Sequence, residues 1–170
     1  MEMKFLLNKI IVVTLLCISG VFAQRRQEFK SPDGQVRAVV NNIFDEYGQH
    51  ESKIHIFNSK GKTIFDTSFV SKDTQHGFGV IHTGWTADSR FFVFAIMSSG
   101  GHQPWHFPIL AFYVPGHYVL DFDRLVGAVT SDFKLSPPDS LRTKILKNPK
   151  STSEDKDVNI KLSDLIKKLN

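Results

Sequence analysis

The stretch SSGGHQPWHFP, residues 98–108, places two histidines around one tryptophan. Imidazole nitrogens bind zinc and transfer protons near neutral pH, and loop tryptophans often serve in recognition. Pro104 and the neighbouring glycines argue against a helix that would hold His102 and His106 on one face. The loop could therefore bind a metal, recognise a partner or ligand, or simply connect two strands.

A metal site at this loop needs a third ligand, and no spacing in the sequence identifies one. The candidates for this third ligand are His50, His82 and Asp45, each chosen only because its side chain can bind a metal. We therefore assign no metal and no cofactor. Two interpretations stay open. In the first, Trp105 and His106 pack over an apolar sheet and His102 is partly exposed. In the second, a recognition surface contains His102, Trp105, His106, Phe107 and Tyr47.

Two carboxylates, Asp121 and Asp123, fall on one face of the expected strand YVLDFD. Paired carboxylates can act as acid and base or bind calcium, but a polar face near a sheet end is the simpler explanation. We interpret His82 as a hydrogen-bonded strand residue and His117 as an exposed turn residue. The sequence has no G-x-S-x-G, phosphate-loop or H-E-x-x-H motif. We assign no catalytic residue and favour a non-enzymatic protein.

The chain opens MEMKFLLNKIIVVTLLCISGVFAQRR, with lysines before an apolar run and small residues before Gln24. This is the layout of a signal peptide over residues 1–23. Only 15 residues lie between Lys9 and Arg25, fewer than the about 20 that span a bilayer. Cleavage after Ala23 is therefore favoured over a retained anchor. We expect a secreted, periplasmic protein whose mature chain is not an integral membrane protein.

Cys17 is the only cysteine and lies within the expected signal peptide. The chain beyond it has no disulfide and must be stabilised by its hydrophobic core. Residues 24–138 carry 11 basic and 11 acidic side chains, and residues 139–170 carry 8 and 5. The basic balance is therefore not a stripe on the folded domain, and we expect no nucleic-acid partner.

An internal repeat relates SPDGQVRAVV (31–40) to TADSRFFVFA (86–95), at an offset of 55 residues. Each copy opens with Ser or Thr, places Asp two residues later and continues into an apolar strand. Further strands recur at the same offset: 53–58 and 63–67 match 108–114 and 118–122, and a weaker third copy begins at 136. A fixed period marks repeated supersecondary units, so we predict consecutive antiparallel strands. The same alignment makes residues 41–52 equivalent to the GGHQPWHFP stretch, and we expect both to be loops that emerge on one rim of the fold.

Two expected strands, FFVFAIM (91–97) and PILAFYV (108–114), are apolar on both faces. A strand with one solvated face would alternate between apolar and polar residues. Both strands must therefore be covered on two sides, as in stacked sheets or packed propeller blades.

The Ser-Pro-Asp-Gly turn before a strand, and GWTADSRFFVF with its aromatic residue before the turn, resemble the blades of TolB-like β-propellers. The resemblance covers about two blades, residues 29–141. It implies blade-like sheets and brings no catalytic residue with it. Two blades cannot close a ring, so we expect them to pack blade on blade or as a sandwich. Exposed edge strands would then favour homo-oligomers.

The segment KNPKSTSEDKD (147–157) has no apolar residue and predicts a flexible linker after a β domain over residues 24–146. The tail VNIKLSDLIKKLN (158–170) fits both a strand and an amphipathic helix. We expect a short helix from about Ser163 that docks on the domain or covers a sheet edge.

Together these features predict an all-β protein of antiparallel, propeller-blade-like repeats with a short C-terminal helix. For function, they favour a non-enzymatic module that binds a protein or an envelope component. One alternative is a small metal-dependent or hydrolytic enzyme that uses His102, His106 and either His82 or Asp121. Another is a structural subunit that completes a larger assembly through its edge strands.

Overall fold

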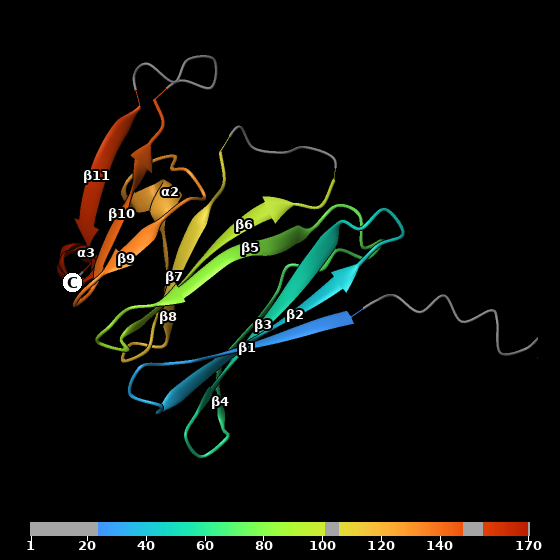
Figure 1. Cartoon of the computed structure of the whole chain (residues 1–170), viewed down its shortest axis with the longest axis horizontal. Coiled ribbons are helices and arrows are strands. Elements are labelled where there is room, and N and C mark those ends of the chain that lie inside the picture. The colour runs from blue at the N-terminus through green and yellow to red at the C-terminus, as the bar shows by residue number, and fades with distance from the viewer. Residues whose placement is uncertain (1–23, 101–105, 148–154, 170) are drawn as a thin grey trace, which may run out of the picture.

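The computed structural model of the chain describes residues 24–100, 106–147 and 155–169. Its strands form three antiparallel sheets, each made of strands consecutive in the chain (Figure 1). The first sheet contains β1 (Gln24–Lys30), β2 (Val36–Phe44), β3 (His50–Asn58) and β4 (Thr63–Ser68). The second contains β5 (Phe78–Trp85), β6 (Phe91–Ser98), β7 (Ile109–Tyr113) and β8 (Tyr118–Asp121). The third contains β9 (Lys134–Ser136), β10 (Ser140–Ile145) and β11 (Lys156–Lys161), and the helices are α2 (Phe122–Leu125) and α3 (Leu162–Leu169). The predicted all-β class is confirmed.

The turn before the second strand of each four-stranded sheet has the same hydrogen bonds in both copies. In the first copy, Ser31 Oγ donates to Asp33 Oδ1 at 2.6 Å, and the backbone N–H two residues after Asp33 donates to the same oxygen at 3.0 Å. In the second copy, Thr86 Oγ1 donates to Asp88 Oδ1 at 2.6 Å, and the corresponding N–H donates at 3.1 Å. The internal repeat is therefore a repeat of local structure, as its spacing predicts.

The three turns also contact one another in chain order. The backbone N–H of Asp33 donates to Ser89 Oγ of the second turn at 3.0 Å. The backbone N–H of Asp88 donates to the Pro138 carbonyl of the third turn at 3.2 Å. These bonds hold the sheets in a stacked order at one end of the molecule. The third turn lies where the weaker third copy is expected.

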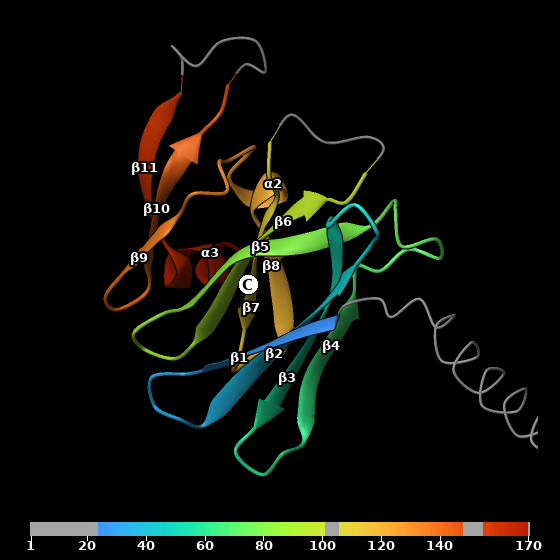
Figure 2. The same ribbon diagram turned by 45° about the vertical axis from the view of Figure 1, so that its right-hand side comes forward.

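The second sheet lies between the other two, so both of its faces are buried (Figure 2). One face of β6, with Phe92 and Phe94, packs against Ala38, Ile54 and Ile56 of the first sheet. The opposite face packs against the third sheet and α3, and its cluster includes Phe91, Val93, Ala95, Leu141 and Leu165. This arrangement confirms that the doubly apolar strands are covered on two sides.

The outer face of the first sheet is covered by polar side chains. Arg37 lies over the Phe57 ring at 4.6 Å and pairs with Glu28 at 3.1 Å. His55 and Asp66 pair across β3 and β4 at 2.8 Å. A polar outer face is what the terminal unit of a stacked repeat requires.

The edge strand β1, QRRQEFK, is rich in charges that discourage pairing with another chain. Association through edge strands stays a prediction.

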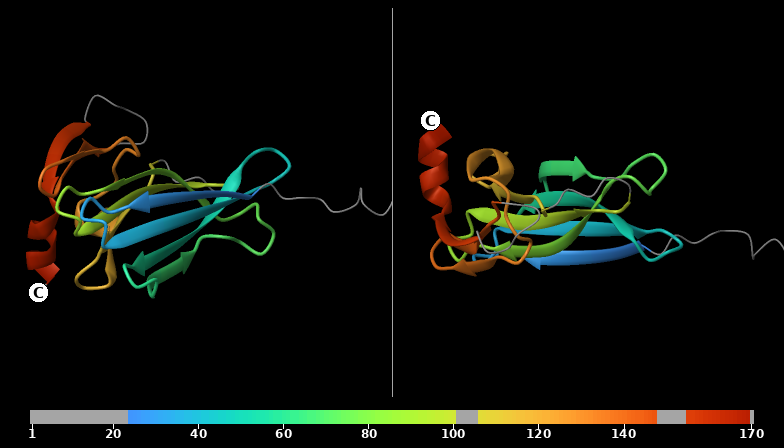
Figure 3. Two further views of the ribbon diagram at one scale, coloured as in Figure 1. Left: turned by 60° about the horizontal axis from the view of Figure 1, so that its bottom comes forward. Right: turned by 90° about the horizontal axis from the view of Figure 1, so that it is seen from above.

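The sequence of the C-terminal segment fits both a strand and a helix, and the structure contains one of each. Strand β11 pairs along its whole length with β10, and α3 follows it directly. Leu162, Leu165 and Ile166 of α3 join the buried cluster under the second sheet. The helix lies at one end of the stack, against the second and third sheets (Figure 3). No helix among the described residues is long and apolar enough to cross a membrane.

The expectations for the 41–52 loop and for the start and end of the linker are tested only in part, and the first is wrong. Residues 41–52 are mostly strand rather than loop, because β2 and β3 pair as far as Phe44 with His50. Residues 156–157 of the expected linker belong to β11, while residues 148–154 lie outside the described part. The signal-peptide prediction also falls on residues outside it, so it stays a prediction.

Candidate functional site

A hollow of about 490 Å³ lies where the β2–β3 turn meets the end of β6. Residues 48–50 and 97–100 line this rim hollow. The second of these segments leads into residues 101–105, which lie outside the described part of the chain and include His102 and Trp105. The β2–β3 turn and the end of β6 thus lie on the same rim of the stack, as the repeat alignment predicts (Figures 1 and 3).

Tyr47 lies beside this hollow at the tip of a rigid turn. Its side chain is 76% exposed. The Asp45 carboxylate accepts hydrogen bonds from the backbone N–H groups of Tyr47 and Gln49 at 2.9 and 2.8 Å. Gly48 takes a φ of 79°, a conformation that glycine adopts without strain. The turn therefore presents an aromatic ring to solvent from a fixed backbone. A hydrogen bond and the negative charge of Glu46 raise the pKa of Tyr47, so the ring stays a neutral phenol.

Glu51 lies one residue beyond the hollow lining and is completely buried. Its Oε1 accepts hydrogen bonds from Ser71 Oγ, Gly77 N and Ser99 Oγ at 2.7, 2.6 and 2.7 Å. Its Oε2 accepts from Ser71 N at 2.7 Å. These donors come from the β4–β5 connection and from the end of β6. One carboxylate therefore joins the first sheet, the second sheet and the connection between them.

Burial and hydrogen bonding act on the Glu51 carboxyl in opposite directions. Desolvation is the largest influence and raises its pKa. The donors on Ser99, Ser71 and Gly77 lower the pKa and together outweigh desolvation, so it lies below the ordinary value. Glu51 is therefore a charged anchor under the rim. A buried carboxyl that serves as a general acid has a raised pKa, which is the opposite of the shift at Glu51.

His50 is also held by its neighbours. Its Nε2 lies 3.1 Å from the Val80 carbonyl of the second sheet, and its ring lies 5.1 Å from Phe44. A side chain at Gly79 would reach within 2.4 Å of the His50 carbonyl, so a glycine is needed for this close approach. His50 thus positions the β2–β3 turn on the second sheet.

His106, at the other end of loop 101–105, pairs with Asp123 of α2. The His106 Nε2 lies 2.7 Å from Asp123 Oδ2. Asp121 instead ends β8 and caps α2, since its Oδ1 accepts a hydrogen bond from Asp123 N at 3.0 Å. The expectation that the two carboxylates share one strand face is therefore wrong, because the chain turns into a helix after Asp121. Phe107 is half-buried beside His106.

Glu51 and His106 are related by the 55-residue repeat offset. Glu51 is the second residue of the third strand of its sheet, and His106 precedes the third strand of the other sheet by three residues. Each is bonded to the segment just after the fourth strand, Glu51 to Ser71 and His106 to Asp123. The equivalent position therefore has an anchoring role in both units. Sequence reasoning overlooked Glu51, although its alignment with His106 was a signal that could have identified it.

The remaining candidates for chemistry do not converge. His82 Nε2 lies 3.2 Å from the Phe133 carbonyl, on the side of the third sheet, whereas Trp85 Nε1 donates to Phe29 O at 3.0 Å on the first-sheet side. The two side chains thus point to opposite faces of the second sheet. Among residues 24–100, 106–147 and 155–169, no three His, Cys, Asp or Glu side chains are arranged to hold a metal ion. His102 is outside these ranges, so the metal alternative at the loop is untested.

Of the five predicted surface residues, the structure describes Tyr47, His106 and Phe107. It places Tyr47 in the β2–β3 turn, next to Gly48 of the hollow lining, and His106 against α2. No protein-family model matches the chain, and a search of curated proteins finds no significant match to it. The likeness to TolB-like propeller blades therefore depends on the turns and strand order of this chain alone.

Proposed function

We propose that the protein is a secreted, periplasmic, non-enzymatic module that binds a protein partner at the rim hollow. The observation that carries the proposal is Tyr47, an aromatic side chain 76% exposed on a rigid turn beside a hollow of about 490 Å³. Aromatic anchors are enriched where protein interfaces gain most of their binding energy. A fixed backbone lowers the entropy lost on binding.

The lining of the hollow supports a protein rather than a strongly charged ligand. Met97 is 38% exposed at its wall. The other lining residues include no carboxylate, lysine or arginine: Gly48, Gln49, His50, Ser98, Ser99 and Gly100. Exposed Met and Tyr provide apolar contact, and the backbone and hydroxyl groups around them provide hydrogen bonds. This mixture is typical of the central part of a protein interface.

The test is affinity capture from an envelope extract with residues 24–170 as bait. Y47A and M97A should each lower the amount of a specific partner that is retained, because truncating an anchoring residue costs at least about 2 kcal/mol, or about 30-fold in affinity. K60A is the matched control, since Lys60 lies on the exposed β3–β4 turn. Unchanged capture by both rim variants would contradict the proposal.

The alternative is a small metal-dependent or hydrolytic enzyme at the His102 and His106 loop. The His106–Asp123 contact at 2.7 Å favours it, because a carboxylate that orients an imidazole is a recurrent part of catalytic and metal sites. Metal analysis of protein purified without a histidine tag tests the metal-dependent version. One metal ion per chain, lost in H106A, would support it. A metal content well below one per chain would remove it.

A further inference from the structure

The third sheet has one face buried and one face turned to solvent. On β10, Leu141 and Thr143 are buried, whereas Arg142 and Lys144 are exposed. On β11, Lys161 is exposed on the same side as Arg142, because Ser140 pairs with Lys161 and residues two apart share a face. The buried face packs on the second sheet. The outer face of the third sheet therefore points away from the stack.

Positive charge is concentrated on this outer face around Arg142. The expectation that the basic balance lies away from any folded face is therefore wrong, because the basic C-terminal segment folds into β10 and β11. Lys134 of β9 is directly opposite Arg142 in the strand register. Lys144 follows two residues later on the same strand, and Lys161 lies diagonally across on β11. We call these four side chains the basic face. Like charges placed directly opposite each other destabilise a sheet, so the pair formed by Lys134 and Arg142 has an energetic cost.

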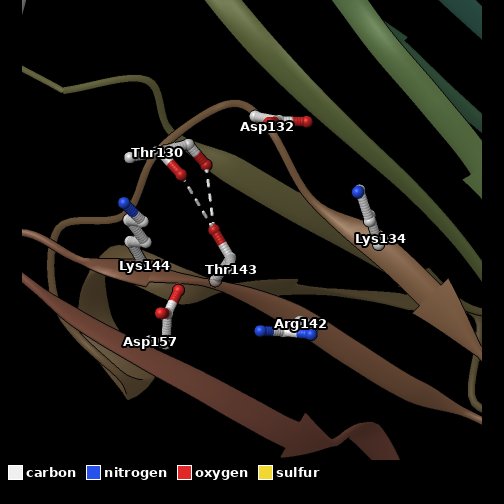
Figure 4. Close-up of a pocket in the computed structure, with 7 residues that line it drawn as sticks. All are labelled: Thr130, Asp132, Lys134, Arg142, Thr143, Lys144 and Asp157. Atoms are coloured by element: carbon white, nitrogen blue, oxygen red, sulfur yellow. Dashed lines mark hydrogen bonds between the residues drawn. The ribbon is translucent and has the colours of Figure 1, made fainter.

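The acidic side chains nearby compensate only part of this charge. Asp157 is opposite Lys144 in the register, and Asp132 lies at the border of the same face. Within the described residues, none of the four cations forms an ion pair at 4.0 Å or less. Figure 4 shows Lys134, Arg142 and Lys144 spaced around a shallow hollow of about 390 Å³. The Thr143 hydroxyl, on the buried side of β10, donates to the Thr130 carbonyl at 3.2 Å.

The basic face lacks the apolar centre of a typical protein interface. The large apolar side chains that are exposed in the described residues lie elsewhere: Tyr47, Ile81, Met97 and Leu169. Protein interfaces have an apolar core from which charged residues are depleted. A basic surface without such a core fits a partner that presents many mobile negative charges.

We propose that the basic face binds the surface of an anionic phospholipid bilayer. The phosphate groups of the lipids would contact Lys134, Arg142, Lys144 and Lys161, and Arg142 can donate two parallel hydrogen bonds to one phosphate. The contact is electrostatic and superficial, so it weakens as salt is added. This site is separate from the rim hollow and does not depend on the function proposed there.

The experiment is co-sedimentation of residues 24–170 with vesicles. This segment contains every strand and helix described and both hydrophobic clusters, and it omits the apolar run of residues 10–18. We expect binding to equimolar phosphatidylglycerol and phosphatidylcholine at low salt, and little binding to phosphatidylcholine alone. Each Lys or Arg near an anionic membrane contributes about 1 kcal/mol, so K134A/R142A should lower the partition coefficient about 30-fold.

The matched control is K60A/K62A, which removes the same charge from the exposed β3–β4 turn and should bind almost as the wild type does. K144A/K161A is a second basic-face variant and should lose binding as K134A/R142A does. Circular dichroism checks that each variant is folded.

Three results would overturn the proposal. The first is equal binding to the two kinds of vesicle. The second is equal losses in the basic-face and control variants. The third is binding to a soluble polyanion, such as heparin or a short DNA duplex, without binding to anionic vesicles.

Discussion

Ser99, just after β6, donates a hydrogen bond from its Oγ to Oε1 of Glu51 on β3 at 2.7 Å. This bond crosses from the second sheet to the first beneath the rim hollow. Gly77 in the connection between the sheets donates to the same two residues, at 2.6 Å to Glu51 and at 3.0 Å to Ser99 Oγ. The candidate binding surface is therefore built over a closed hydrogen-bond network.

Replacing Glu51 by Ala should lower the free energy of unfolding by about 3 kcal/mol, because buried donors on Ser71, Gly77 and Ser99 would lose their acceptor. Urea unfolding followed by fluorescence measures the change. E28A on the exposed edge strand β1 is the control and should change the stability by less than about 0.5 kcal/mol. Equal effects of the two substitutions would show that the network does not stabilise the fold.

The same carboxylate should make stability depend on pH. The pKa of Glu51 is lower in the folded protein than its ordinary value of 4.5. Its stabilising contribution is therefore complete above about pH 4.5 and is lost as the pH falls through the folded pKa. The pKa values of Asp33, Asp73 and Asp164 are also lowered, that of Asp73 to about 2, so the wild type has a broad acid decline.

Unfolding midpoints in urea between neutral pH and pH 3 measure this dependence. In E51Q the decline should be shallower than in the wild type, because the amide cannot be protonated in this range. An identical slope in the two proteins would mean that Glu51 titrates with the same pKa in the folded and unfolded states.

The repeated turns offer a matched pair of substitutions. Asp33 and Asp88 each accept a hydroxyl hydrogen bond at 2.6 Å and a backbone N–H bond two residues further on. D33A and D88A should each destabilise the protein, by about 1 kcal/mol for the lost turn bonds. Comparison of their urea midpoints with that of D66A, on an exposed strand position, tests this. A large effect in only one copy would contradict the energetic equivalence of the two turns.

Two glycines should respond differently to Ala. A Cβ at Gly77 would lie 2.1 Å from the Phe69 carbonyl and 2.7 Å from Glu51 Cδ, so G77A must displace the β4–β5 connection. Gly34 has a φ of 71° and open space around its Cα, so G34A has only the backbone strain, about 1 kcal/mol. Thermal unfolding should therefore show a much larger loss for G77A. A similar loss in both variants would show that the connection can move freely.

The sequence contained enough information for the class of fold and for its repeat. The turn residues Ser31 and Asp33, and their counterparts Thr86 and Asp88, act through local hydrogen bonds, so the offset of 55 residues reveals them directly. The apolar run of β6 also carries its information locally. Burial of a strand on both faces removes the alternation of polar residues, so the sequence of β6 alone predicts that its sheet is covered on two sides.

The site was harder to predict because its contacts are long-range. Glu51 stands in an alternating strand like any solvated carboxylate, and its partners are 20 to 48 residues away in the chain. The basic face depends on the register that places Lys134 opposite Arg142, which no local pattern specifies. The sequence pattern placed Asp121 and Asp123 on one strand because the helix that contains Asp123 is only four residues long and has no periodicity of its own.

The most direct test of the rim hollow as a partner-binding surface is site-specific photocrosslinking. A benzophenone amino acid replaces Tyr47, Met97 or, as the control, Lys60, and the protein is irradiated in an envelope extract. We predict a discrete adduct with the same partner from positions 47 and 97 and none from position 60. An adduct from position 60 with none from 47 and 97, or the same adduct from all three, would contradict the assignment.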